Sequence, residues 1–368
     1  MYRHTKANLP HLNQAYESDF DNHPIYKRIG GWVCDKDTGE LKYKLDKNNW
    51  NFKENGEPSV LTGEDGDVMV TIPPYFYKID SATKTFEIDS IIPNENGDNG
   101  RPGFSVHPAF LTKNNKVKPY ILSGAYKGSI IANQLRSVSG VLPAHTNTIA
   151  WFTDRARQGR NTGSNWHDIT RFYERQAITL LLLFEFGTLN SQEAVGLGAV
   201  NLSSAIQTGS SNELGDRSGY LGENGKTSIR YRGIEDYWGN IWEFVTGFMI
   251  TDRGYHYTND PSKFLNLSAM SLYEKDLSVK IPDGYITGIE MLPSNEWMMI
   301  PNKTGGNTNT YFCDYLYTHN SGQENITLIG GRWNAGAHAG AFYFGCNSSA
   351  SLSLRTVVAR LVCSKEVV

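Results

Sequence analysis

Only one stretch of this 368-residue chain carries the pattern of a long α-helix. Residues 171–186 are rich in helix formers, Asp168 or Thr170 can cap their start, and Gly187 stands where helices commonly end. Glycine (36 residues) and proline (14) together make about 14% of the chain, and aromatic residues make another 12%. This composition favours short strands and long irregular loops around one buried helix.

Strand patterns predict two units of unequal size. Segments 29–34 and 41–45 have the composition of short strands, within a polar region that ends near residue 65. From Val68 onward the chain becomes β-branched and aromatic. We expect residues 1–65 to form a β-rich segment for attachment or oligomerisation, and residues 66–368 to form a ligand-binding domain. Further strand-like segments are 107–111 and 120–126.

Charge and hydropathy argue against several classes of protein. The net charge is −3 and no basic stripe is evident, so we do not expect nucleic-acid binding. The longest apolar run, Ala177 to Phe184, is far too short to span a membrane. The N-terminus lacks the apolar core of a Sec signal peptide. The four cysteines are scattered, which predicts free thiols in a reducing compartment.

Motifs for catalysis and metal binding are weak. The nine histidines lack the spacings that put two on one helix face, and no G-x-S-x-G occurs. Gly225-Lys226-Thr227 is not a phosphate loop, because Tyr220 replaces the first glycine. Residues 64–67 could touch calcium, but a solvated turn is favoured. Arg155, Arg157 and Arg160 could meet an anionic ligand, but a solvated loop or salt bridges to nearby acidic side chains are favoured. We expect no catalytic residue, cofactor or metal.

Two tryptophan motifs are the most informative features of the C-terminal half. They read Gly239-Asn240-Ile241-Trp242-Glu243-Phe244 and Gly330-Gly331-Arg332-Trp333-Asn334, and the chain then closes with Ala359-Arg360-Leu361-Val362. We expect Trp238, Trp242 and Trp333 to be core residues, because tryptophan supplies large rigid packing area. With the helix before them, these motifs resemble the C-type-lectin-like fold of the formylglycine-generating-enzyme (sulfatase-modifying) superfamily over about residues 66–368. The resemblance implies an α+β fold with short strands, few helices and long irregular loops, and a small N-terminal β appendage.

Within that superfamily, region 330–361 most resembles the variable proteins of diversity-generating retroelements and their relatives in phage tails. Their pattern G-G-x-W-N-x-G-x-x-A-G-x-F is met at residues 330–342, and their A-R-L at 359–361. Adenine-directed mutagenesis of Asn codons cannot create Lys, Glu, Gln, Met or Trp. Window 332–358 contains none of the first four, although they make 52 of the 368 residues, and its single tryptophan is Trp333.

The resemblance implies a ligand-binding surface built from this window. Its candidate residues are Arg332, Asn334, Ala335, His338, Tyr343, Phe344, Ser348, Leu352, Leu354 and Arg355. Leu352 and Leu354 alternate, so both would share one face of a strand. If that face is exposed, they form a binding patch with Tyr343 and Phe344; if it is buried, they belong to a core strand. For Arg332 and His338 the alternative is a solvated loop.

Enzymes share this fold, so the resemblance alone does not decide the function. The formylglycine-generating branch uses a closely spaced cysteine pair, whereas Cys346 and Cys363 are 17 residues apart. The H-x-x-x-H-x-E signature of the iron-dependent sulfoxide-synthase branch is absent. We therefore expect a non-enzymatic binding protein with a diversified surface, encoded by a phage or prophage. The alternatives are a fixed-specificity tail or baseplate protein and a sulfatase-modifying-type oxidase.

The expected partner of such a protein is a bacterial cell-surface protein or glycan, and its expected place is the virion tail. Weak individual sites gain from several copies of a binding protein, which is an avidity argument. We therefore hypothesise a homo-oligomer, with a trimer as one form, although no heptad repeat supports it. Neither a nucleic acid nor a membrane is expected as a partner.

Overall fold

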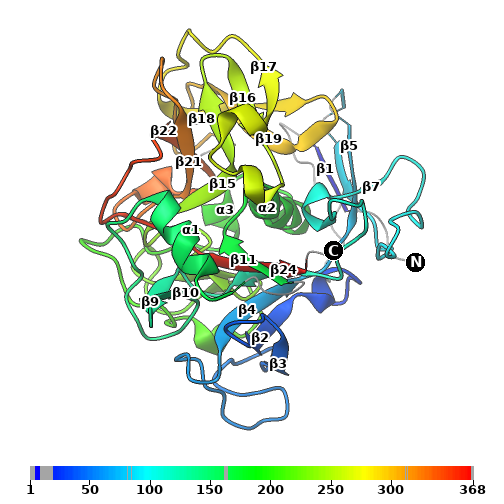
Figure 1. Ribbon diagram of the computed structural model, residues 1–368, viewed down its shortest axis with the longest axis vertical. Coiled ribbons are helices and arrows are strands. Elements are labelled where there is room, and N and C mark those ends of the chain that lie inside the picture. Colours follow the sequence, from blue (N-terminus) through cyan, green and yellow to red (C-terminus); the bar gives the residue numbers. More distant parts are fainter. Residues whose placement is uncertain are drawn as a thin grey trace.

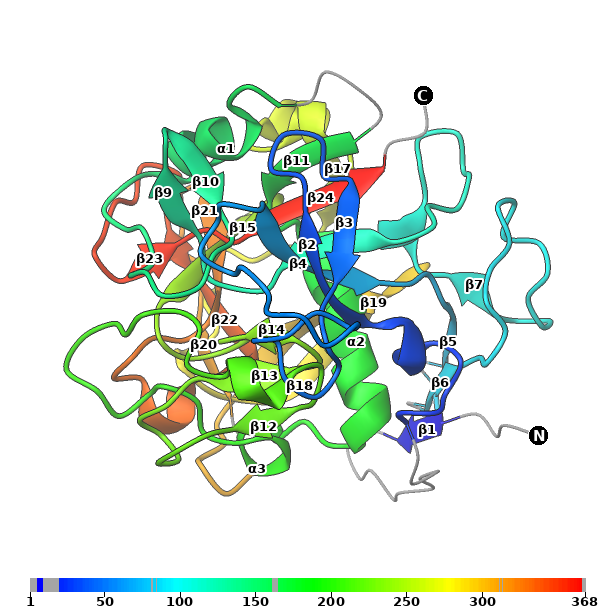
Figure 2. The ribbon, with the colours of Figure 1, turned by 90° about the horizontal axis from the view of Figure 1, so that it is seen from below.

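The computed structural model describes residues 5–8, 20–80, 82–83, 85–160, 165–310, 312 and 314–365. Strands and loops dominate and helices are few, as Figures 1 and 2 show. The α-helices of the described chain are α1 (Ile149–Arg157), α2 (Phe172–Phe186) and α3 (Ser191–Ala194). The 3-10 turns are η1 (Tyr26–Arg28), η2 (Pro108–Phe110), η3 (Asn212–Leu214), η4 (Pro261–Lys263), η5 (Leu267–Ala269) and η6 (Gly336–His338).

Helix α2 lies in the middle of the molecule (Figure 1), and its residues from Phe172 to Phe184 are buried. Its predicted end is confirmed: Gly187 has a left-handed φ of 61° and donates its N–H to the Leu183 carbonyl at 2.8 Å. The predicted cap is wrong. Arg171 occupies the N-cap position without a side-chain hydrogen bond, and the Asp168 carboxylate instead pairs with Arg157 at 2.6 Å.

One antiparallel sheet of six strands joins the start, the middle and the end of the chain. Its order is β11-β24-β8-β4-β2-β3. The strands are β11 (Asn165–Ile169), β24 (Leu361–Lys365), β8 (Ile121–Gly124), β4 (Asp67–Ile72), β2 (Gly30–Cys34) and β3 (Leu41–Lys44). Figure 2 shows β24 lying beside β11, close to β2 and β4.

This sheet contains strands from both sides of the domain boundary that we expected near residue 65. Strand β2 pairs with β4 from Gly30↔Thr71 to Cys34↔Asp67, so a continuous sheet crosses that point. The Tyr26 hydroxyl also donates to the Leu181 carbonyl of α2 at 2.6 Å. Residues 20–65 are therefore part of the same packed body as the residues that follow. Their role in attachment or oligomerisation stays a prediction.

A nine-stranded sheet forms the other large layer. Its order is β17-β16-β15-β21-β22-β20-β18-β19, with β23 paired to β15. The strands are β15 (Trp242–Thr251), β16 (Gly254–Tyr257), β17 (Ser271–Glu274), β18 (Gly284–Leu292), β19 (Asn295–Thr304), β20 (Tyr315–Tyr317), β21 (Asn325–Gly330), β22 (Gly340–Ser348) and β23 (Val357–Val358). Both tryptophan motifs and the window 332–358 belong to this layer or its loops.

Smaller sheets complete the fold. A four-stranded sheet has the order β1-β6-β5-β7, β9 pairs with β10, and β12, β13 and β14 form a three-stranded sheet. The strands are β1 (Thr5–Asn8), β5 (Phe76–Asp80), β6 (Thr85–Ile88), β7 (Ser105–Val106), β9 (Ser129–Ile131), β10 (Gln134–Arg136), β12 (Gly219–Tyr220), β13 (Ile229–Tyr231) and β14 (Ile234–Glu235).

One of the strand predictions is wrong. Segment 107–111 is the turn η2 and not a strand, because the His107 ring nitrogen accepts the Ala109 N–H and Pro108 follows at the first turn position. The region ahead of α2 contains the helix α1, capped by the Thr148 hydroxyl. At the end of α1, Arg157 pairs with Asp168 and Arg160 pairs with Asp67. The salt bridges predicted for these two arginines are therefore confirmed.

Candidate ligand-binding surface

The two tryptophan motifs contact each other through their backbones. The Gly239 N–H donates to the Gly330 carbonyl at 3.0 Å, and the Trp333 N–H donates to the Asn240 carbonyl at 2.8 Å. Gly331 has a φ of 84°, and a Cβ there would lie 2.5 Å from the Ala339 Cβ. Only glycine fits such a position. The contacts between the two motifs therefore hold the backbone at the start of the window 332–358 in place.

A buried ion cluster holds the other end of the window. The Glu243 carboxylate pairs with Arg360 at 2.8 Å and with Lys127 at 3.0 Å, and all three side chains are buried. Burial alone would raise the pKa of Glu243, but the charges of Arg360 and Lys127 outweigh it and hold that pKa at about 2. Arg360 also donates to the carbonyls of Gly124, Glu235 and Asp236. The window thus lies between two rigid anchors.

Several window side chains reach the surface. Asn334, Leu354 and Arg355 are exposed, with Leu354 at 45%, while Arg332, Ala335, His338, Ser348 and Leu352 are half-buried. Arg332 and Arg355 make no ion pair with any residue that the structure describes. Their guanidinium groups instead lie 4.6 Å from the Trp242 ring and 5.9 Å from the Trp333 ring.

Tyr343 and Phe344 do not belong to an exposed patch, and that expectation is wrong. They are 2% and 5% exposed, because strand β22 is the parallel partner of β20 and the antiparallel partner of β21. Leu352 and Leu354 do not share a strand face either, since residues 349–356 form turns and irregular chain. Leu352 packs against the core cluster that contains Trp333, and Leu354 faces solvent.

The tryptophans differ from one another. Trp238 is fully buried and Trp333 is 5% exposed, whereas Trp242 is half-buried. The Trp242 ring is stacked with Tyr343 at 6.2 Å on one side, and the Arg332 guanidinium contacts it from the loop. Trp242 therefore lies where the core meets the surface of the window.

On β18, β20 and η6, four half-buried aromatic side chains form what we call the aromatic platform: Tyr285, Tyr315, Tyr317 and His338. His338 stacks on Tyr315 with ring centroids 4.1 Å apart and 19° between planes. Tyr285 meets both rings edge-on at 5.2 and 5.3 Å. Burial lowers the pKa of His338, so its ring is neutral at physiological pH. The platform thus combines one neutral imidazole ring with three half-buried tyrosine rings.

The platform and Arg332 are linked beneath the surface. Tyr317 lies 6.1 Å from the buried Tyr343 ring, which in turn stacks on Trp242. Strand pairing fixes this arrangement, since β20 lies between β22 and β18 in the order of the sheet. Rigid aromatic side chains beside an unpaired guanidinium are the residue types that dominate binding energy in protein interfaces.

Three platform residues were missed in the sequence. Tyr285, Tyr315 and Tyr317 precede the window and carry no recognisable motif. The alternation Tyr315-Leu316-Tyr317 was the available signal: it puts both tyrosines on one face and buries Leu316 on the other. The pairing of β20 with β22 and of β18 with β20 brings these tyrosines to His338, and neither pairing can be recognised from the local sequence.

The described residues give little indication of a reactive thiol or of a metal-binding site. Burial raises the pKa of both Cys346 and Cys363 to about 12, so neither thiol ionises readily near neutral pH. Cys313 lies outside the described residues. Within the described chain, no group of three or more His, Cys, Asp or Glu side chains could hold a metal ion. In the calcium candidate 64–67, the Asp67 carboxylate is already paired with Arg136 and Arg160.

No described helix has the length and apolar character needed to cross a lipid bilayer. The described part of the chain is mostly β, and its half-buried aromatic platform includes His338 of the window 332–358.

No family model and no curated protein matches the chain. Among solved structures it is similar to the Major Tropism Determinant U1 variant, at 14% identity over 88% of this chain and 94% of that one, with a TM-score of 0.29. The P3c variant is similar at 12% identity over 92% and 97%, with a TM-score of 0.27. TM-scores this low support no conclusion about the fold or function of this chain.

Proposed function

We propose that this chain is a non-enzymatic receptor-binding protein and that it binds through the aromatic platform together with the exposed side chains of window 332–358. The observation that carries the proposal is the platform itself: stacked, half-buried aromatic rings beside Arg332, which no described carboxylate neutralises. Partly exposed tyrosines and arginines are enriched in protein interfaces relative to the rest of the surface. The partner is a bacterial cell-surface protein or glycan.

The composition of the window supports diversification of this surface. Residues 332–358 contain no Lys, Glu, Gln or Met, as adenine-directed mutagenesis of Asn codons requires. Most of the candidate positions are exposed or half-buried, and they lie between the Gly331 turn and the Arg360 ion cluster. A surface can vary in sequence only where the fold does not depend on it. In this proposal the chain is part of a virion tail, where a homo-oligomer would add avidity.

A fixed-specificity tail or baseplate protein is the second candidate. One observation favours it: Tyr285, Tyr315 and Tyr317 lie outside the window and would not be diversified. In such a protein the three tyrosines make the main contacts with the partner, and the window residues make only a smaller contribution to the affinity.

Binding of the labelled protein to a panel of bacterial strains, read by flow cytometry, tests the proposal. The variant Tyr315→Ala/Arg332→Ala should lose at least tenfold in apparent affinity, which corresponds to about 1.4 kcal/mol or more. Tyr220→Ala is the matched control, because Tyr220 is an aromatic residue that is 38% exposed and lies outside the platform.

The control should bind like the wild type, and thermal unfolding should show that both variants fold. Equal binding by the wild type and a folded double variant would refute the proposed site. Wild-type protein that binds no strain above background would refute the receptor-binding function.

A further inference from the structure

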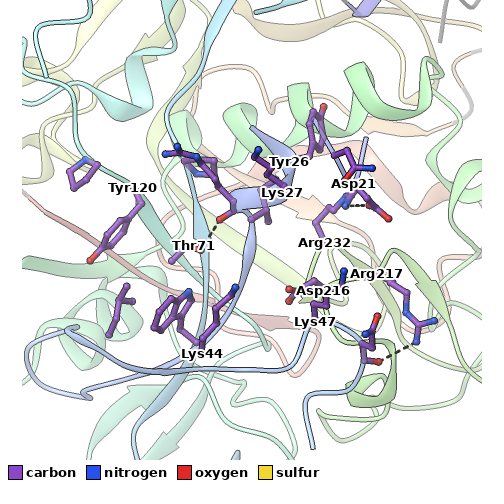
Figure 3. A pocket seen from close by; sticks show the side chains of 18 residues that line it. Asp21, Tyr26, Lys27, Lys44, Lys47, Thr71, Tyr120, Asp216, Arg217 and Arg232 are labelled. Carbon is purple, nitrogen blue, oxygen red and sulfur yellow. Dashed lines mark hydrogen bonds and ion pairs between the residues drawn. The ribbon is translucent and has the colours of Figure 1, made fainter. Parts of the chain in front are cut away.

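A separate groove lies on the six-stranded side of the molecule, away from the platform. Its volume is about 650 Å³, which falls within the roughly 300–1,000 Å³ of small-ligand sites. Turn η1, strands β2 and β3, and the loops at 47–48, 119–120 and 216–217 line it. Figure 3 shows its labelled side chains arranged around the hollow.

The lining of this groove is strongly basic on a chain that is slightly acidic overall. Six lysine and arginine side chains line it against two aspartates, whereas the net charge of the chain is −3. Lys27, Arg28, Lys47 and Arg217 are exposed, and none of them forms an ion pair within the described part of the chain. Such a local excess of unpaired cations favours an anionic ligand.

The acidic groups of the groove do not cancel these charges. Asp21 pairs with Arg232, whose guanidinium also binds Glu185 at 2.6 Å. Asp216 accepts hydrogen bonds from the Gly31 N–H and the Trp50 indole N–H, both at 3.0 Å. Burial raises the pKa of Asp216 to about 6, so the carboxylate is still mostly charged at neutral pH, but these two N–H groups already hold one of its oxygens.

The backbone of the groove is held in place before any ligand arrives. The Asp216 N–H donates to the Lys47 carbonyl at 2.8 Å, and Arg217 donates to the Asn48 carbonyl at 3.2 Å. On the opposite side, the Thr71 hydroxyl donates to the Arg28 carbonyl, as the dashed line in Figure 3 marks. A preorganised site loses less entropy on binding.

Two features narrow the ligand class. The cations that form no ion pair are spread over η1, the loop after β3 and the loop after η3, instead of converging on one glycine-rich turn. Such spacing suits a ligand with several separated acid groups. Half-buried Trp32 and Tyr120 also line the groove, and aromatic faces pack well against the C–H groups of sugar rings.

We propose that this groove binds an acidic oligosaccharide, with Lys27, Arg28, Lys47 and Arg217 pairing with its anionic groups and Trp32 and Tyr120 contacting its sugar rings. The site is independent of the aromatic platform, because it is built on the six-stranded sheet while the platform is built on β18, β20 and η6. The carboxylate or sulfate nature of the acid groups is left for the experiment to distinguish.

The test measures binding by calorimetry to the full chain. Tetragalacturonate presents carboxylates, a heparin tetrasaccharide presents sulfates as well, and cellotetraose is the neutral probe. At least one acidic probe should bind at least tenfold more tightly than cellotetraose, and its affinity should fall with added salt. Lys27→Glu/Lys47→Glu should weaken that binding at least tenfold.

The matched control is Lys78→Glu/Lys303→Glu. It makes the same change of charge at two lysines outside the groove that form no ion pair with described residues, and it should bind like the wild type. Four results would overturn the proposal: no binding of either acidic probe, equal binding of cellotetraose, equal binding by a folded Lys27→Glu/Lys47→Glu variant, or tighter binding of inorganic phosphate or AMP than of both acidic tetrasaccharides.

Discussion

At the scale of single residues, Glu243 and Arg360 explain why two short motifs far apart in the sequence occur together. Glu243 belongs to the first tryptophan motif and Arg360 to the closing Ala-Arg-Leu. Their buried ion pair, at 2.8 Å, ties β15 to the segment that enters β24. The sequence shows both residues but not their contact, because 117 residues separate them.

Removal of one partner of this buried pair should be costly. Arg360→Met leaves the buried Glu243 carboxylate with Lys127 as its remaining ion-pair partner, and we expect a loss of about 3–5 kcal/mol in the free energy of unfolding. The matched control is Arg253→Met, because Arg253 and Glu274 are mostly exposed and lie 3.8 Å apart. That change should cost less than about 1 kcal/mol. Similar losses in urea unfolding of the two variants would contradict the role given to the buried pair.

At the scale of elements, helix α2 shows which structural signals a sequence carries. Gly187 predicted its end correctly, because a left-handed φ is a local property of the chain. The start was misjudged, because the Asp168 carboxylate that could have capped the helix is used by Arg157. The sequence thus predicts features that depend on the local backbone, such as a helix end. It does not predict which of several possible partners a side chain will bind once the fold has brought them together.

The end of α2 supports a direct prediction. Gly187→Ala should lower the free energy of unfolding by about 1 kcal/mol, because a Cβ disfavours the φ of 61°. Gly187→Asn should cost less, since asparagine tolerates the left-handed region better. The comparison is made by urea unfolding, and equal costs for the two substitutions would show that the left-handed conformation is not what requires glycine.

At the scale of the whole molecule, strand pairing decides which window residues can meet a partner. The sequence predicted strands around 29–34 and 41–45 and an informative window, and the structure contains β2 and β3 there. It could not show that β2 joins β4 in one sheet, or that β20 lies beside β22. The pairing of β20 with β22 helps to bury Tyr343 and Phe344 and brings Tyr315 to His338. Long-range strand pairing therefore decides which candidate residues are buried in the core and which can contact a partner.

The central claim is that the window is a diversified surface held on a fixed scaffold. Sequencing the DNA immediately downstream of the gene tests it most directly. We predict a near-copy of the codons for 330–361 that differs only where the copy has adenine. The differing codons should belong to surface positions: Arg332, Asn334, Ala335, His338, Ser348, Leu352, Leu354 and Arg355. Buried Trp333, Phe342 and Val357 should match. The absence of a near-copy, or differences concentrated at those buried codons, would contradict the claim.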